Sequence, residues 1–195
     1  MKKNLLILFL LVSSIAIYSQ QVATGYVFDD ANRNGKKERR EAGIANVAVS
    51  NGSDVVLTDD KGYYSIAVDE GNTLFVIKPS GYMTPVDEHF IPIFYYHHKP
   101  EGSPDSFTYK GVPPTGKLPK SINFPLYKQG ESNNFTVVIF GDPQPYSIQD
   151  LDYFTRKIVH DVKKTDKTVF GISLGDIVGD NLDLLPIYKE RRSEE

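Results

Sequence analysis

Residues 135–180 read FTVVIFGDPQPYSIQDLDYFTRKIVHDVKKTDKTVFGISLGDIVGD, and this stretch decides how the second half of the chain folds. Two short and almost unbroken apolar runs, TVVIF and TVFGISL, are typical of parallel strands that are buried on both faces. Between the runs, apolar residues recur at helical spacing, at Leu151, Phe154, Ile158 and Val162. The stretch therefore predicts a strand, helix, strand (βαβ) unit with a parallel pair of strands.

A Gly-Asp pair follows each predicted strand. Asp142 begins the sequence Asp-Pro-Gln that ends at Gln144, and Asp176 begins Asp-Ile-Val-Gly-Asp, which ends at Asp180. The carboxyl ends of parallel strands meet at one edge of a sheet, where open α/β sheets bind ligands, so we expect Asp142 and Asp176 to lie side by side. One Gly-Asp pair alone is better explained as a turn or a helix N-cap. Two pairs, one crossover apart, favour a shared site for divalent ions.

The N-terminal residues have the order of a secretory signal. Lys2 and Lys3 precede an apolar run from Leu5 to Ile17, and small or polar residues follow up to Gln20. The run is short for a bilayer span, although an uncleaved anchor or a buried helix stays open. We therefore expect residues 1–20 to be a cleaved signal peptide and the mature protein to be secreted, periplasmic or at the cell surface, with no membrane span after cleavage.

Charge and cysteine content narrow the function classes. The chain has 22 Lys and Arg, two of them in the signal, against 25 Asp and Glu, so the charge without the signal is −5. This mild acidity argues against nucleic acid as the main partner. The chain contains no cysteine, which excludes a disulfide framework and a lipid-modified cysteine anchor.

Residues 21–80 have the pattern of a small β domain. Short β-rich runs (ATGYVF, NVAVS, DVVLT, YYSIAV and TLFVIK) are separated by turn residues, which predicts an antiparallel β-sandwich. Alternation within YYSIAV should send Tyr64 and Ile66 to one face, and Tyr63 and Ser65 to the other.

The segment DANRNGKKERRE, residues 30–41, has the spacing of a calcium-binding loop. The candidate ligands are Asp30, Asn32, Asn34, Lys36 through its carbonyl oxygen, and Glu41. The loop follows a predicted strand rather than a helix, and four cationic side chains crowd it. A solvated turn joining two strands is the alternative.

Residues 25–78 resemble the B-type repeats of bacterial cell-wall adhesins and the related transthyretin-like modules. The resemblance rests on GYVFDDANRNGKKERREAGIANVAVSNG followed by TDDKGYYSI. It implies a β-sandwich with a calcium loop after its first strand. Such modules act as spacers, as adhesive units or as appendages to enzymes, so a non-enzymatic, calcium-stiffened surface module is an alternative function for this chain.

Residues 81–130 are predicted to be a connector rich in proline and aromatic residues that ends in a strand. Nine of the twelve prolines of the chain fall between Pro79 and Pro125. The aromatic density of FIPIFYY is too high for a disordered linker. His97 and His98 are adjacent, so on an extended segment they point in opposite directions and one metal ion cannot easily bind both.

The strand-end motifs resemble those of the calcineurin-like metallophosphoesterase family. Asp142 and Gln144 stand where the family has Asp-x-His, and Gly175-Asp176 matches its second motif. The resemblance implies an α/β metallophosphoesterase domain over residues 131–195, two divalent transition-metal ions (Mn, Fe or Zn) and a phosphate-ester substrate. Asp142 and Gln144 would hold one ion, and Asp176 would bridge both. Asp180 would at most contact these ligands without binding an ion itself. Gln144 is a weaker ligand than the usual histidine.

The family continues into a Gly-Asn-His motif and further histidine motifs, whereas NLDLLPIYKERRSEE follows Asp180 here. We therefore expect the chain to be the N-terminal part of a secreted phosphoesterase, truncated after the second motif and lacking catalytic activity. The expected fold is an N-terminal antiparallel β-sandwich followed by the βαβ start of an α/β metallophosphoesterase domain.

Overall fold

The computed structural model describes residues 21–162 and 168–193, so the predicted signal peptide at residues 1–20 lies outside the described residues. The β-rich part contains β1 (Gln21–Asp29), β2 (Ala48–Ser50), β3 (Val55–Leu57), β4 (Tyr63–Val68), β5 (Thr73–Val76), β6 (Tyr82–Met83), β7 (Tyr95–His97) and β8 (Phe124–Lys128). The second part contains β9 (Thr136–Gly141), α2 (Ile148–Phe154), the π-helical η1 (Thr155–Val159), α3 (His160–Val162), β10 (Thr168–Leu174) and α4 (Leu184–Ser193). Among the helices of the described ranges, none is long and apolar enough to cross a membrane.

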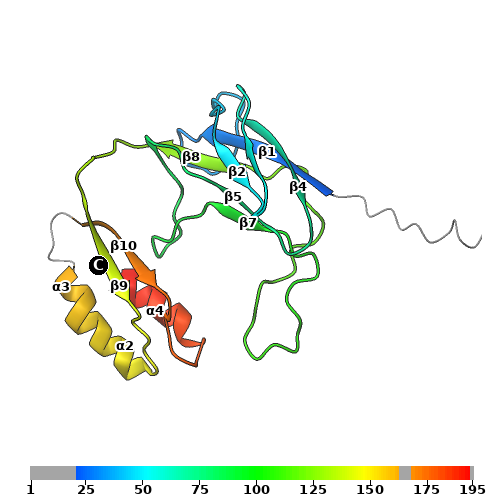
Figure 1. Cartoon of the computed structure of the whole chain (residues 1–195). Helices are drawn as coiled ribbons and strands as arrows, with labels where there is room; N and C mark the ends of the chain where they lie inside the picture. The colour runs from blue at the N-terminus through cyan, green and yellow to red at the C-terminus, as the bar shows by residue number, and fades with distance from the viewer. Residues whose placement is uncertain (1–20, 163–167, 194–195) are drawn as a thin grey trace, which may run out of the picture.

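The first eight strands form two four-stranded sheets, with the orders β4-β1-β8-β6 and β3-β2-β5-β7 (Figure 1). The paired strands of these sheets are antiparallel, as predicted, except that β8 runs parallel to β1 with Val27 opposite Phe124. The difference has a topological cause. The chain leaves β7 at the other sheet and returns through residues 98–123, which allows β8 to enter beside β1 in the same direction.

The two sheets bury one shared apolar core. Its residues come from both sheets: Ala23, Val27, Val47, Val49, Tyr64, Ile66, Val68, Leu74, Val76, Ile122, Phe124 and Leu126. In β4 the alternation follows the prediction, because Tyr64 and Ile66 are buried whereas Tyr63 and Ser65 are exposed.

A close backbone approach fixes β8 against β1. A Cβ atom at Gly25 would collide with the carbonyl group of Ile122, so glycine is required at this position. The same carbonyl accepts a hydrogen bond of 2.7 Å from the buried hydroxyl of Tyr64, whose pKa is raised by burial. The N–H of Ile122 donates to Thr24 O at 2.8 Å. Because these groups are buried, breaking one bond would leave an unpaired polar group.

The sheets extend beyond residue 80 into the predicted connector. Within residues 81–130, β6 pairs with β8, and β7 pairs with β5. The final strand expected near residues 121–127 corresponds to β8. The proline-rich segment is therefore part of the strand pairing of the β-rich part.

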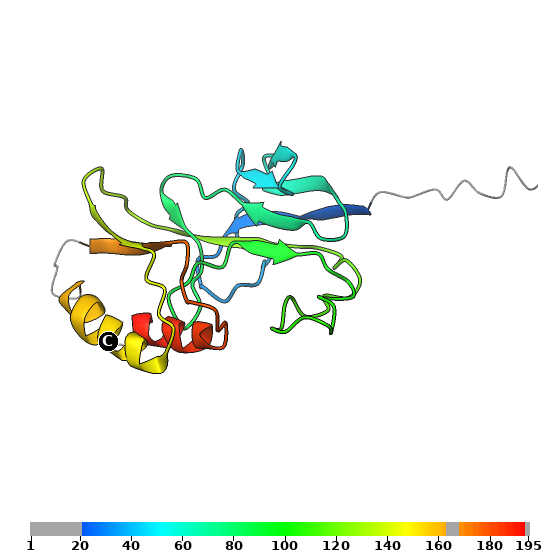
Figure 2. The same cartoon turned by 60° about the horizontal axis from the view of Figure 1, so that its bottom comes forward.

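The second part is built on a pair of parallel strands, with Ile139 of β9 opposite Ile172 of β10. The helices α2, η1 and α4 lie on one side of this pair (Figure 2) and share a buried cluster of Leu151, Phe154, Val159, Val178, Leu184 and Tyr188. The opposite side exposes Ile139, Ile172 and Leu174 by 59%, 41% and 56%. One face of the pair is thus covered and the other is open.

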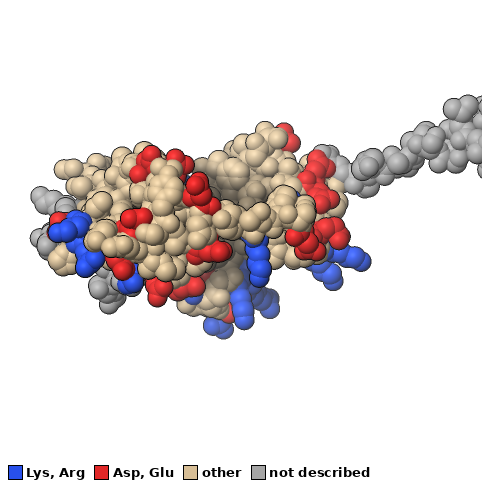
Figure 3. Space-filling view, turned by 90° about the horizontal axis from the view of Figure 1, so that it is seen from below, with Lys and Arg blue, Asp and Glu red and all other residues tan. Residues whose placement is uncertain are grey.

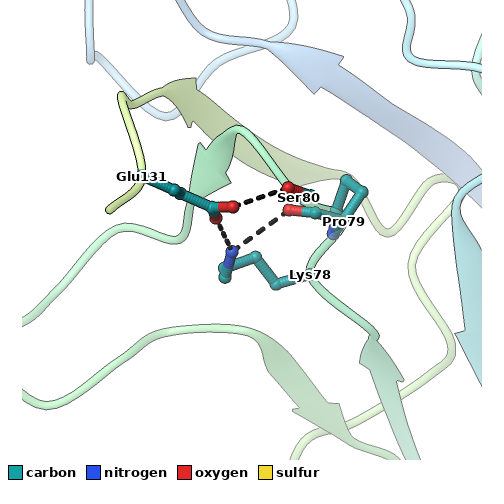
Figure 4. A network of polar contacts seen from close by, with 4 residues as sticks. All are labelled: Lys78, Pro79, Ser80 and Glu131. Carbon is teal, nitrogen blue, oxygen red and sulfur yellow. Dashed lines mark hydrogen bonds and ion pairs between the residues drawn. The ribbon is translucent and has the colours of Figure 1, made fainter. Parts of the chain in front are cut away.

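An ionic cluster ties the chain between the two parts to the β-rich part (Figure 4). The ammonium of Lys78 donates to Glu131 Oε1 at 2.7 Å and to Pro79 O at 3.1 Å, and the Ser80 hydroxyl donates to Glu131 Oε2 at 2.6 Å. The hydrogen bond from Lys78, followed by that from Ser80, lowers the pKa of Glu131 to about 2. The cluster holds the linker that leads from β8 to β9.

We expect the Glu131 carboxyl to titrate near pH 2 rather than near its ordinary 4.5. The ionised form is favoured in the folded state, so the contribution of Glu131 to stability is present above about pH 4.5 and is lost as the pH falls through about 2. NMR titration of the side-chain carboxyl carbon measures this midpoint. Lys78→Ala should raise it, whereas Lys61→Ala should leave it unchanged. An ordinary midpoint in the wild-type chain would contradict the cluster.

Candidate metal site at the ends of strands β9 and β10

The structure brings the backbones of the predicted ligands Asp142, Gln144 and Asp176 together. Asp142 directly follows β9, and its N–H donates to Leu174 O at the end of β10 at 3.3 Å. The N–H of Gln144 donates to Asp176 O at 2.8 Å. Asp142 and Asp176 are exposed and Gln144 is half-buried. The two strand ends therefore form one edge that carries two carboxylates and one amide.

All three predicted ligands have strained backbones. Among the described residues, six non-glycine residues have positive φ, and Asp142 (54°), Gln144 (36°) and Asp176 (28°) are three of them. A Cβ atom makes this region unfavourable by about 1–2 kcal/mol per residue. Strain of this kind persists where the surroundings enforce it and is concentrated at functional sites. Its concentration on the three ligand positions suggests a function for this edge.

The helix-cap explanation accounts for neither aspartate. Helix α2 is capped by Ser147, whose hydroxyl accepts from the N–H of Asp150 at 3.2 Å. Helix α4 starts at Leu184, whose N–H donates to Asn181 O at 3.2 Å. Asp142 and Asp176 therefore stand in the loops before these helices and away from their N-caps.

A second set of contacts holds the two loops to each other. The N–H of Gly179 donates to Pro145 O at 2.9 Å. A Cβ atom at Gly179 would meet the ring of Tyr146, so glycine allows the loops to come this close. Asp180 is exposed, and its carbonyl oxygen accepts a hydrogen bond of 2.9 Å from the hydroxyl of Tyr109, 71 positions earlier.

The donor set fits a divalent ion in part. Within the described residues, no hydrogen bond or ion pair engages the side chains of Asp142, Gln144 and Asp176. Their oxygen atoms are hard ligands that suit Mn²⁺ or Mg²⁺ better than thiophilic metals. Over residues 21–162 and 168–193, no three His, Asp or Glu side chains are grouped so as to hold a metal ion. Metal binding at this edge stays a prediction.

In the candidate calcium loop, the carboxylate of Asp30 accepts hydrogen bonds from backbone N–H groups. Asp30 is 1% exposed, and its two oxygens accept from the N–H groups of Asn34 at 3.1 Å and Gly35 at 2.7 Å. The side-chain amides of Asn32 and Asn34 both donate to Glu38, at 3.2 and 2.9 Å. These bonds already give the loop a defined shape.

The remaining positions of that loop leave calcium binding untested. The N–H of Lys36 donates to Asn34 Oδ1 at 2.8 Å. One carboxylate oxygen of Glu41 accepts from the Glu38 N–H at 2.9 Å, and the other is buried without a partner among the described residues. Calcium binding at this loop is therefore still a prediction.

The two adjacent histidines differ in burial, as their opposite directions require. His97 is half-buried, and its Nδ1 lies 2.8 Å from the hydroxyl of Thr73. His98 is fully buried, and neither ring nitrogen has a partner within the described part of the chain. It lines a hollow of about 490 Å³ with Glu101 and Lys117 among its other walls. The structure does not bring the two imidazoles to one site.

Sequence reasoning did not identify Tyr109. The contact of its hydroxyl with the loop of Asp176 and Asp180 joins two parts of the chain that no local pattern relates. The strained φ angles were also unforeseen, because Asp is one of the residues that tolerate either sign of φ. The Gly-Asp pairs at strand ends were the available signal.

One comparison with known proteins gives a match. Residues 31–112 match the family model described as the N terminal of calcineurin-like phosphoesterase. The matched range starts in the loop after β1, runs past residue 80 and includes Tyr109, but it ends before Asp142. A search of curated proteins gives no match. The match supports the calcineurin-like phosphoesterase family, whose members are generally metal-dependent and act on phosphate esters.

We expect glycine to be more stable than alanine at position 176. Replacing Asp176 by Gly relieves the positive φ of 28°, so Asp176→Gly should unfold at higher urea than Asp176→Ala, by about 1 kcal/mol. Lys157 is the control, because it is exposed, lies inside the helical segment η1 and is not among the residues with positive φ. There the order should reverse. If alanine is at least as stable as glycine at position 176, the account of backbone strain is wrong.

Proposed function

We propose that this chain carries the first metal ligands of a two-metal phosphoesterase of the calcineurin-like family. In this proposal Asp142 and Gln144 would hold one divalent ion, and Asp176 would supply carboxylate oxygens to both ions. The observation that carries it is the 2.8 Å backbone bond from Gln144 N–H to Asp176 O, which joins the two strand ends at one edge. The family match over residues 31–112 supports it independently, because that range contains none of the three ligands.

The residues of the edge have separable tasks in this proposal. The carboxylates of Asp142 and Asp176 supply negative charge that is exposed to solvent and available to a cation. Gln144 supplies a neutral amide oxygen, so the ion at this position would be held more weakly than by imidazole. When bound, a pair of divalent ions activates water and orients a phosphate for in-line attack.

The three ligands do not fill a coordination shell. A transition-metal centre requires about four to six donors per ion, whereas no three His, Asp or Glu side chains of the described residues are grouped so as to hold a metal ion. We therefore propose that the 195-residue chain binds a divalent ion weakly and does not hydrolyse phosphate esters by itself.

The second part, residues 131–195, is proposed to belong to an α/β metallophosphoesterase domain. Its strands β9 and β10 are parallel and are joined through α2, η1 and α3. The exposed face with Ile139, Ile172 and Leu174 is the kind of apolar face that an α/β sheet buries on its second side. Helices on both faces are the rule for parallel sheets of this class.

The β-rich part is proposed to be a secreted, transthyretin-like module. The order of charge, apolar run and polar residues in positions 1–20 supports export across a membrane. The face drawn in Figure 3 carries acidic side chains over its middle and basic side chains mainly at its edges, which argues against nucleic acid as the main partner.

A second candidate function is a non-enzymatic surface module stiffened by calcium. The observation that favours it is the loop of residues 30–41, where Asp30 and Gly35 are bonded as the first and sixth positions of a calcium loop would be. The buried oxygen of Glu41, which has no partner among the described residues, is a metal-ligand candidate at the last position of this loop.

We expect the purified chain to bind Mn²⁺ through the strand-end carboxylates. Isothermal titration calorimetry should show binding by the wild-type chain. Asp142→Ala and Asp176→Ala should each weaken it by at least about tenfold, because each removes a charged ligand. Asp60→Ala removes an exposed carboxylate in the turn before β4, far from the edge in sequence, and should leave the affinity unchanged.

Equal affinities in the wild-type chain and both edge variants would contradict the proposal. Calcium titration of the same proteins distinguishes the second candidate function from the first. The calcium-stiffened module is the better account if two results are found together. Ca²⁺ binds and Asp30→Asn abolishes this binding, whereas Asp142→Ala and Asp176→Ala leave the Mn²⁺ affinity unchanged.

A further inference from the structure

The segment between β7 and β8 forms a loop with a pinned base, which we call the 99–116 loop. The N–H of Thr115 donates to Lys99 O at 3.0 Å, and the N–H of Lys99 donates to the Thr115 hydroxyl at 2.9 Å. Further along, Ser103 N–H donates to Val112 O at 2.8 Å, and Val112 N–H donates to the Ser103 hydroxyl at 3.0 Å. Two crossed pairs of bonds thus give the loop a defined shape.

The tip of the 99–116 loop reaches the segment that starts at Asp176. In Figures 1 and 2 the loop extends from the β-rich part toward the chain that leads into α4. The half-buried Tyr109 donates its hydroxyl to Asp180 O at 2.9 Å. Residues 103–114 also enclose a hollow of about 670 Å³ at this tip. A loop of the β-rich part therefore touches the segment that starts at Asp176.

A second contact from the same middle segment meets the second part further along. His89 and Ile91 line a small cavity of about 80 Å³ together with Ile177, Leu185, Tyr188 and Lys189. The pKa of Asp87 is lowered, chiefly by the hydrogen bond from Ile91 N–H, and the charge of Lys189 adds to the shift. The chain from Asp176 into α4 is thus contacted at two places by residues of the β-rich part.

The segment from Asp176 to Asp180 depends on such contacts. Asp176 has a strained φ of 28°, which persists only if neighbouring groups enforce it. Gln144 N–H holds Asp176 O at 2.8 Å, and Pro145 O holds Gly179 N–H at 2.9 Å. These bonds come from the β9 side. Tyr109 adds a bond from the opposite direction at the far end of the segment.

We infer that Tyr109 is a positioning residue for the metal site and that the β-rich part, through the 99–116 loop, holds Asp176 in its ligand conformation. The inference rests on the proposed metal site at Asp142, Gln144 and Asp176. It assigns the β-rich part a role in forming that site, beyond a spacer or an adhesive unit. Tyr109 itself does not touch a metal ion or a substrate in this scheme.

The expected size of the effect follows from a population argument. If the segment binds metal only when it is docked, the apparent affinity falls in proportion to the docked fraction. Loss of one hydrogen bond changes such an equilibrium by about three- to tenfold. The metal affinity should fall by a similar factor while the Asp176 carboxylate stays in place.

Tyr109→Phe tests the inference, because it removes the hydroxyl and keeps the ring. Hydrogen exchange measured by mass spectrometry should become faster in the segment from Asp176 to Asp183 and stay unchanged in β1 and β4. Mn²⁺ affinity should fall by about three- to tenfold. In the Asp176→Ala background, Tyr109→Phe should have no further effect on Mn²⁺ affinity, which a merely structural role would not produce.

Tyr153→Phe is the matched control. Its hydroxyl accepts a hydrogen bond of 3.0 Å from Gln149 within α2, away from the strand ends, so both readouts should match the wild type. Unchanged exchange in Tyr109→Phe, or unchanged Mn²⁺ affinity in Tyr109→Phe while Asp176→Ala weakens it, would overturn this inference alone. A wild-type chain without Mn²⁺ binding would overturn the proposed function and this inference with it.

Discussion

The fold depends on the close approach of the chain at Ile122 to strand β1 at Gly25. The missing side chain of Gly25 leaves room for the Ile122 carbonyl, which accepts the buried hydroxyl of Tyr64 at 2.7 Å. This contact brings β8 into the sheet parallel to β1 and completes the core shared by both sheets. Because β8 leads into β9 through a linker held by Glu131 and Lys78, the direction in which the chain enters the second part follows from the same contact.

At the candidate site, by contrast, the backbone conformation is locally unfavourable for stability. Asp142, Gln144 and Asp176 have positive φ angles that favour glycine, yet two are acids and one is an amide. Backbone bonds between the two loops enforce this conformation, and Tyr109 adds a contact from the β-rich part. Such strain is typical of positions selected for function at the cost of stability. The β-rich part contacts this segment at Asp180, four residues after the strained Asp176.

Local sequence patterns predicted much of the fold but less of the candidate site. The parallel pairing of β9 with β10 could be anticipated from two unbroken apolar runs, and the burial of Tyr64 and Ile66 from simple alternation. The strands β6 and β7 have two and three residues, too few for a periodic signal in a proline-rich segment. The parallel entry of β8 and the bond from Tyr109 to Asp180 depend on contacts between distant segments, which no local pattern contains. Sequence therefore identified the ligand candidates but not the groups that hold them in place.

The central claim is that the two strand ends form one metal site, and paramagnetic broadening tests it most directly. Substoichiometric Mn²⁺ added to the ¹⁵N-labelled chain broadens the amide signals of residues within roughly 10–15 Å of the ion. We expect simultaneous broadening at Asp142 and Gln144 and at residues 175–177, because the N–H of Gln144 and the carbonyl of Asp176 are 2.8 Å apart. The signals of residues 30–41 should stay sharp at the same Mn²⁺ concentration. Broadening at one strand end alone, or first at residues 30–41, would contradict the account.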